Sequence, residues 1–143
     1  MNNQPPPPEF ESQPAPPFDV DQETAVIGAV LINPGMYPML DLRPDDFYIQ
    51  RHRSIWQAMG KLYDAGMGID IMTIERTLKD MGDWEKVGMN AGLTAFLLNV
   101  PTSLHAETYA ASVRDFAERR RLIAVAQDLA KVAYDQQANL ADV

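Results

Sequence analysis

The chain has 143 residues, enough for one ordinary domain with a buried core and too few for two. It contains no cysteine, which excludes disulfide scaffolds, cysteine–zinc sites and thiol catalysis. With 12 basic and 20 acidic residues the net charge is −8, which disfavours a domain that grips nucleic acid through its phosphates. No apolar run reaches the ~18 residues of a membrane span, and the acidic N-terminus is not a signal peptide. These features predict a cytoplasmic protein with no membrane contact.

Residues 1–18 form a proline-rich tail. They contain two acidic residues, no basic residue and seven of the 11 prolines, namely Pro5, Pro6, Pro7, Pro8, Pro14, Pro16 and Pro17. Such a composition favours extended polyproline II and cannot bury a core, so we expect a disordered tail or linker. Because Pro5 and Pro8 have P-x-x-P spacing, a ligand for an aromatic groove is the alternative.

Short helices are expected from Asp19 onward. Asp19 is placed to cap the first, which carries apolar residues as far as Leu31 and is stopped by Asn33-Pro34-Gly35. A short turn of helix is plausible over Met36–Leu40, and Arg43-Pro44 forces the next break.

The middle of the chain holds the strongest amphipathic pattern, made by Ile49, His52, Ile55, Trp56, Met59, Leu62 and Tyr63. It predicts a helix ended by Gly66 and Gly68. Asp70 then caps a helix that Gly82 ends, and Leu93–Leu97 predict a further short helix. Since no period-two pattern lasts for a strand, the fold class is all-α, with a compact multi-helix globule over residues 19–103.

Residues 104–143 are expected to hold a long C-terminal helix, because residues 104–135 contain neither Gly nor Pro. Thr102 or Ser103 is its expected cap. On a helical wheel at ~100° per residue, the apolar side chains of the first half share one face and those of the second half lie opposite. The first set is Tyr109, Val113, Phe116 and Ala117, and the second is Leu122, Ala126, Leu129 and Ala133. Either the second half projects and packs on something else, or a kink near residue 120 lets both halves cover one core.

The sequence shows no recognisable catalytic or metal-binding motif. His52 and His105 lack a partner histidine at helical spacing, so we expect a structural role for His52 and an exposed or capping role for His105. Asp45 and Asp46 are expected to be helix-start acids that complement the helix dipole. No phosphate-loop or G-x-S-x-G motif occurs, so no catalytic, metal or cofactor residue is predicted.

Arg119, Arg120 and Arg121 form the one basic cluster, at the point where the apolar face changes sides. Acidic neighbours at helical spacing are expected to neutralise it largely, through the pairs Arg114–Glu118, Asp115–Arg119 and Glu118–Arg121. A nucleic-acid contact is the less favoured alternative, and a role in a protein interface stays open.

An ordered set of segments resembles the N-terminal domain of the bacterial DnaB-type replicative DNA helicases. The segments are VDQETAVIGAVL from Val20, LRPDDFY from Leu42, HRSIWQAM from His52, GIDIMT from Gly68, Leu78, VPT from Val100, Tyr109-Ala110, Val113-Arg114, RLI from Arg121 and AYD from Ala133. The resemblance covers about residues 19–143. Two features depart from the family pattern: Met89-Asn90 stands where a Gly-Gly turn is usual, and the proline-rich tail is longer.

The resemblance implies a non-catalytic assembly domain acting in DNA replication, in a bacterium or a phage. In the family such domains end in a helical hairpin and pair into a collar above the motor ring, which supports the hexamer and contacts primase and, in some systems, a helicase loader. ATP and Mg are then expected only in a C-terminal motor domain, and no direct DNA binding is expected here. The long helix becomes the first arm of the hairpin, and we expect Val143 to end a fragment inside the hairpin or a family member without a motor.

The candidate interface residues lie on the long helix. For packing of the hairpin or of subunits we expect the side chains of Phe116, Leu122, Ile123, Val125, Ala126, Leu129 and Tyr134. Arg119, Arg120 and Arg121 are candidates for polar contacts at the same junction. Three other hypotheses remain: a motor-less adaptor or loader-like protein, the helicase-binding domain of a primase, and a small enzyme using His52 beside Asp45 or Asp46.

Overall fold

The computed structural model describes residues 14–98 and 103–143, and these residues form helices and turns without a strand. The α-helices are α1 (Val20–Ile32), α2 (Gln50–Asp64), α3 (Ile71–Met81), α4 (Trp84–Val87), α5 (Met89–Leu98) and α6 (Ala106–Tyr134). Short 3₁₀ helices are η1 (Pro34–Met39), η2 (Pro44–Asp46) and η3 (Leu140–Asp142). The all-α prediction is therefore confirmed. The P-x-x-P spacing at Pro5 and Pro8 lies outside the described residues, as do Val100, Pro101 and Thr102.

Local capping sets where α1 and α3 begin and end. The Asp19 carboxylate accepts hydrogen bonds from the backbone N–H groups of Asp21 and Gln22 at 3.0 and 3.1 Å, so it is the N-cap of α1. Asp70 accepts from the Thr73 backbone N–H at 2.8 Å and caps α3 in the same way. Gly82 ends α3 in the left-handed region, with φ of 78°, where a residue without Cβ is favoured. These starts and stops agree with the sequence.

One expectation about helix boundaries is wrong, and one short helix was not predicted. Ser103 does not cap α6, because the helix begins at Ala106 with His105 at the N-cap position and no side-chain hydrogen bond there. Helix α4 has only four residues, too few to show an apolar periodicity, and no helix was expected there.

The core lies between α1, α2, α3, α5 and the first half of α6, and Trp56 of α2 is its largest side chain. This side chain is fully buried, and its indole Nε1–H donates to the Leu42 carbonyl oxygen at 2.9 Å. The Phe47 and Tyr37 rings lie 5.1 and 4.9 Å from it. One indole therefore joins α2 to the segments around η1 and η2.

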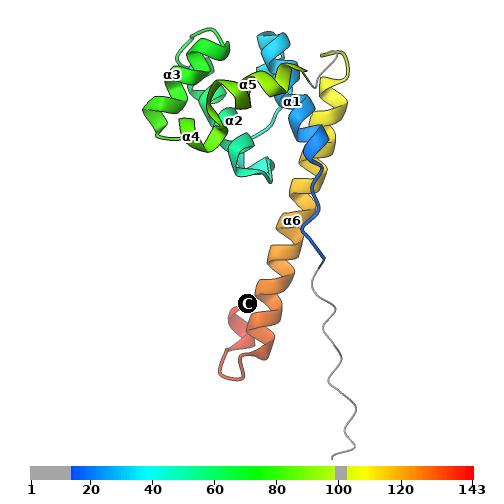
Figure 1. Cartoon of the computed structure of the whole chain (residues 1–143). Helices are drawn as coiled ribbons and strands as arrows, with labels where there is room; N and C mark the ends of the chain where they lie inside the picture. The colour runs from blue at the N-terminus through cyan, green and yellow to red at the C-terminus, as the bar shows by residue number, and fades with distance from the viewer. Residues whose placement is uncertain (1–13, 99–102) are drawn as a thin grey trace, which may run out of the picture.

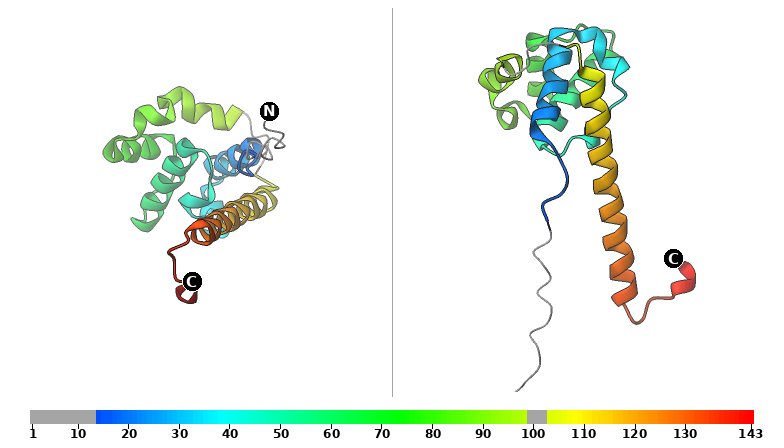
Figure 2. Two further views of the ribbon diagram at one scale, coloured as in Figure 1. Left: turned by 90° about the horizontal axis from the view of Figure 1, so that it is seen from below. Right: turned by 90° about the vertical axis from the view of Figure 1, so that its right-hand side faces the viewer.

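Helix α6 packs along α1 with its first half and then runs clear of the globule (Figures 1 and 2). It is one continuous helix of 29 residues, so the sequence alternative in which both halves cover one core is not observed. None of the helices in the described part of the chain is long and apolar enough to cross a membrane.

Candidate interaction surface

The first half of α6 is docked through small side chains. Its four buried residues are Ala106, Ala110, Val113 and Ala117, spaced by four, three and four positions. This spacing places them on one face of the helix, and three alanines allow the backbone of α6 to approach α1 closely.

The second half of α6 carries apolar side chains that nothing in the described structure covers. The exposed fraction is 70% for Leu122, 43% for Ile123, 55% for Val125, 52% for Leu129 and 79% for Tyr134. Ala126 is also exposed, whereas Phe116 is half-buried beside the globule. Six of the seven predicted apolar interface residues thus share the projecting half, and Phe116 lies before it. We call residues 122–134 of α6 the arm.

Three successive arginines, Arg119, Arg120 and Arg121, lie at the base of the arm and have different hydrogen-bond partners. Arg119 Nε donates to the Asp115 carboxylate at 2.8 Å, on its own helix. Arg121 donates to Glu118 at 2.7 Å and also to the Asp46 carboxylate at 2.6 Å. Arg120 donates to two carbonyl oxygens, those of Pro17 and Asp46, each at 2.8 Å.

Their protonation equilibria reflect these surroundings. Hydrogen bonding to Asp46 raises the pKa of Arg121, and hydrogen bonding to Asp115 raises that of Arg119. Partial burial lowers the pKa of Arg120, which has carbonyl oxygens rather than a carboxylate as direct partners. The expected pairs Asp115–Arg119 and Glu118–Arg121 are present. Arg114 instead donates to the Leu40 and Asp41 carbonyl oxygens, so the third expected pair is replaced by a contact with the globule.

Asp46 is the site residue whose role the sequence did not reveal. It was expected to be a helix-start acid that complements the helix dipole, and it is in addition 4% exposed and in contact with α6. Its other carboxylate oxygen accepts from the Arg43 backbone N–H at 2.8 Å, which is the local helix-start role. The contact with Arg121 spans 75 positions in the chain, a separation that a spacing pattern does not encode.

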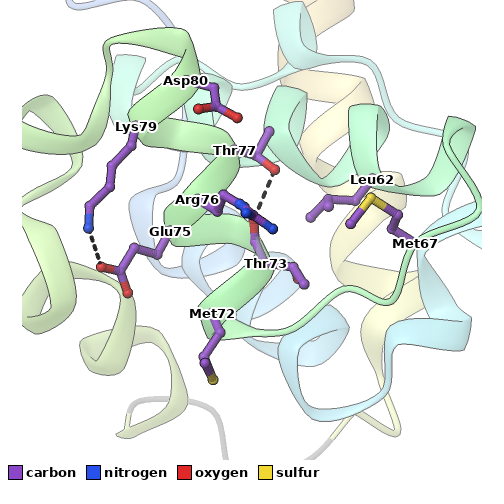
Figure 3. A pocket seen from close by; sticks show the side chains of 9 residues that line it. All are labelled: Leu62, Met67, Met72, Thr73, Glu75, Arg76, Thr77, Lys79 and Asp80. Carbon is purple, nitrogen blue, oxygen red and sulfur yellow. Dashed lines mark hydrogen bonds and ion pairs between the residues drawn. The ribbon is translucent and has the colours of Figure 1, made fainter.

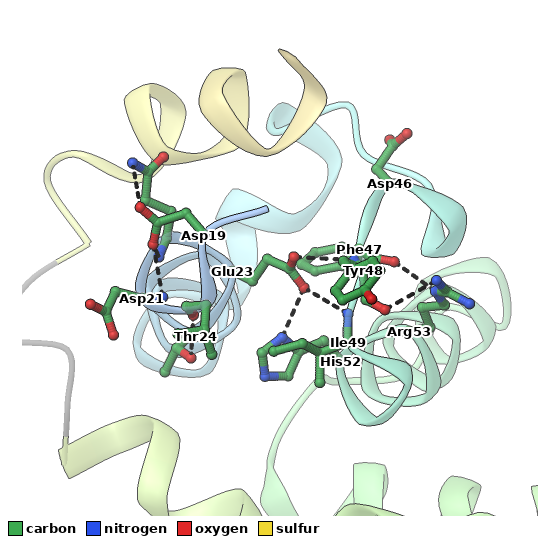
Figure 4. A network of polar contacts seen from close by, with 12 residues as sticks. Asp19, Asp21, Glu23, Thr24, Asp46, Phe47, Tyr48, Ile49, His52 and Arg53 are labelled. Carbon is green, nitrogen blue, oxygen red and sulfur yellow. Dashed lines mark hydrogen bonds and ion pairs between the residues drawn. The ribbon is translucent and has the colours of Figure 1, made fainter. Parts of the chain in front are cut away.

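The buried His52 belongs to a structural network rather than to a catalytic one. Its Nδ1 lies 3.0 Å from Glu23 Oε1, and Figure 4 shows the two side chains meeting between α1 and α2. Among the described residues, His52 Nε2 has no hydrogen-bond partner, so the acid–base pairing of His52 with Asp45 or Asp46 is not formed. His105 is exposed at the start of α6.

An open groove lies beside α3. Figure 3 shows the side chains that line it, including Arg76, Glu75 and Lys79. Lys79 pairs with Glu75 at 2.6 Å within α3, so these two charges neutralise one another. In the residues that the structure describes, no group of three or more metal-ligating side chains comes together.

These features define an all-α domain whose distinctive surface is a projecting helix with uncovered apolar side chains. The family model of the DnaB-like helicase N-terminal domain matches residues 15–115. The chain is 34% identical over 130 residues to the replicative DNA helicase DnaC of Bacillus subtilis, and 36% over 121 residues to DnaB of Pasteurella multocida. These matches cover 90% and 83% of the chain but only 29% and 26% of the relatives.

Solved structures show the same fold. The N-terminal domain of DnaB helicase from Mycobacterium tuberculosis superimposes with a TM-score of 0.85 at 29% identity, covering 90% of this chain and 92% of that one. A DnaB-like replicative helicase described with its interactions with primase gives a TM-score of 0.73 at 22% identity, covering 79% of this chain and 27% of that one.

The chain therefore belongs to the DnaB-like helicase N-terminal domain family. It spans less than a third of the length of the curated relatives named above. The match to the helicase N-terminal domain lies within residues 15–115, and the 143 residues contain no phosphate-loop motif.

Proposed function

We propose that this domain is a non-catalytic assembly and interaction module of a replicative DNA helicase. The observation that carries the proposal is the arm, where five large apolar side chains are 43–79% exposed on a helix that leaves its own core. Exposed apolar surface of this kind is typical of protein–protein contact sites. The arm would pack on a second helical segment and on the same surface of another copy, in the collar of a hexamer.

The proposal assigns the domain a partner outside the ring as well. Two solved structures with this fold, a DnaB-like helicase and the N-terminal domain of DnaB from Helicobacter pylori, are described together with interactions with primase. We expect the globule and the base of the arm to contribute to a contact with primase or with a helicase loader. The net charge of −8 argues against direct DNA binding by this domain.

The remaining parts of the proposal concern the intact helicase. ATP and Mg would be bound by a motor domain, and this domain would hold no cofactor of its own. The place of action would be the cytoplasm.

Sedimentation equilibrium on the 143-residue chain tests the assembly part. We expect an average mass that rises with concentration above the 16.0 kDa of one chain. A mass that stays at one chain up to the solubility limit would contradict it.

Mixing the chain separately with purified primase and with preformed helicase rings distinguishes the alternatives. Binding to primase supports the proposed module. Binding to helicase rings without binding to primase would overturn it in favour of an adaptor, a loader-like protein or the helicase-binding domain of a primase.

A further inference from the structure

The direction of the arm has a specific structural origin. Ala117 is the last buried residue of α6, and every later residue of the helix is half-exposed or exposed. The helix nevertheless continues to Tyr134. Its apolar attachment to the globule therefore ends 17 positions before the helix does.

Polar contacts take over where the apolar attachment ends. Arg121 Nη2 lies 2.6 Å from the Asp46 carboxylate, and Arg120 Nη2 donates to the Asp46 carbonyl oxygen at 2.8 Å. Two successive residues of α6 thus donate hydrogen bonds to the side chain and the backbone of one residue in η2. We call Asp46, Arg120 and Arg121 the clasp.

The buried position of the Asp46 carboxylate restricts the geometry of the clasp. Asp46 is 5% exposed at its side chain and is held in place by the Arg43 backbone N–H, so its carboxylate cannot reorient freely. Charge-assisted hydrogen bonds such as these, at 2.6 and 2.8 Å, are stronger than neutral ones and depend on geometry. Guanidinium groups held in this way restrict both the rotation of α6 and its distance from η2 at this point.

Arg120 of the clasp also contacts the segment that leads into α1. The second Nη of Arg120 donates to the Pro17 carbonyl oxygen at 2.8 Å, and its guanidinium lies 5.5 Å from the centre of the Tyr48 ring. The Phe18 ring stacks on the same Tyr48 ring, with 4.3 Å between the two ring centres. The segment that leads into α1 is therefore bonded to the base of the arm.

We infer that the clasp sets the direction in which the arm leaves the globule and that the Pro17–Phe18 junction helps to hold the clasp in place. A shift of that junction would move Arg120 and re-aim the arm. The competing explanation is that the docked first half of a stiff helix fixes the direction by itself. The inference concerns one chain and does not depend on the proposed function.

Distances between spin labels test the inference. The natural chain contains no cysteine, so Lys61→Cys on α2 and Lys131→Cys on the arm allow clean double labelling. Dilution with unlabelled chain restricts the measurement to distances within one molecule. A second pair, Lys61→Cys and Glu107→Cys, reports the docked start of α6.

The double variant Arg120→Gln/Arg121→Gln should lose the narrow Lys61–Lys131 distance peak and keep the Lys61–Glu107 peak. The matched control is Arg119→Gln, which removes a neighbouring arginine whose partner is on its own helix, and it should keep both peaks. Phe18→Ala should broaden only the distance to the arm. If the double variant keeps the narrow arm distance, the helix alone fixes the direction and the inference is overturned. Loss of the Lys61–Glu107 peak in the double variant would place the two arginines in the folding of the globule, and this outcome also overturns the inference.

Discussion

The carboxylate of Glu23 on α1 lies 3.0 Å from Nδ1 of His52 on α2, and both side chains are buried. The same carboxylate accepts hydrogen bonds from the backbone N–H groups of Tyr48 and Ile49 at 3.1 and 3.3 Å. Ile49 is the N-cap residue of α2 and has no side chain that could cap it. Glu23 thus accepts, from α1, the N–H groups of the two residues that lead into α2.

We expect Glu23→Ala to lower the free energy of unfolding by about 3 kcal/mol, because it leaves buried donors without an acceptor. The matched control is Asp21→Ala, an exposed acid in the same first turn, with an expected cost below about 1 kcal/mol. Urea unfolding followed by tryptophan fluorescence measures both. Equal losses in the two variants would show that Glu23 acts only through the helix dipole.

Tyr37 makes the stability depend on pH in the alkaline range. Burial raises the pKa of Tyr37 above its ordinary value of 10.0, and the negative charges of Asp64 and ionised Tyr63 add to the effect. The folded state therefore holds the phenol proton more tightly than the unfolded state does. This contribution to stability is complete below pH 10 and is lost as the pH rises through the folded pKa.

Replacement of Tyr37 by Phe should remove this contribution, since Phe keeps the ring that packs near Trp56 and Tyr63. The free energy of unfolding of the variant should then fall less steeply above pH 10 than that of the natural chain. Unfolding curves at a series of alkaline pH values give the two slopes. Parallel slopes would mean that Tyr37 titrates alike in both states.

Met89 occupies a backbone conformation that favours glycine. Its φ is 58°, at the first residue of α5, and its side chain is 48% exposed. Met89→Gly should relieve about 1–2 kcal/mol of left-handed strain and lose about 0.5–1 kcal/mol through greater freedom of the unfolded chain. We expect a net gain of about 0.5 kcal/mol and a higher melting temperature. Met89→Ala keeps the Cβ and should give no gain in stability. A gain equal to that of the glycine variant would contradict the presence of backbone strain at Met89.

Features that depend on neighbouring residues were predicted well. The caps at Asp19 and Asp70 and the stop at Gly82 follow from side chains that bond to their own turn of helix, so sequence spacing reveals them. The change of apolar face along α6 was visible for the same reason. This change of face predicted the arm, although the helical wheel alone did not exclude a kink near residue 120.

Partners that are distant in the chain were not predictable. Glu23 and Asp46 both stand in the first turn of a helix, where an acid is favourable without any further role. Folding brings them to His52 and Arg121, 29 and 75 positions away. Nothing in the local pattern distinguishes these two buried acids from the exposed Asp21 and Asp45. Arg120 likewise looked like one of three equivalent arginines, because its carbonyl partners have no signature in the sequence.

The apolar side of the arm is the proposed assembly surface, and a paired substitution tests this assignment most directly. Leu129→Glu places a charge among the exposed apolar residues, whereas Ala124→Glu places the same charge about 140° away around the helix. Both positions are exposed, so both variants should keep the helical content and the tryptophan fluorescence of the natural chain. Sedimentation equilibrium should show that Leu129→Glu abolishes the concentration-dependent rise in mass and that Ala124→Glu preserves it. Unchanged association of Leu129→Glu, or unfolding of its globule, would contradict the claim.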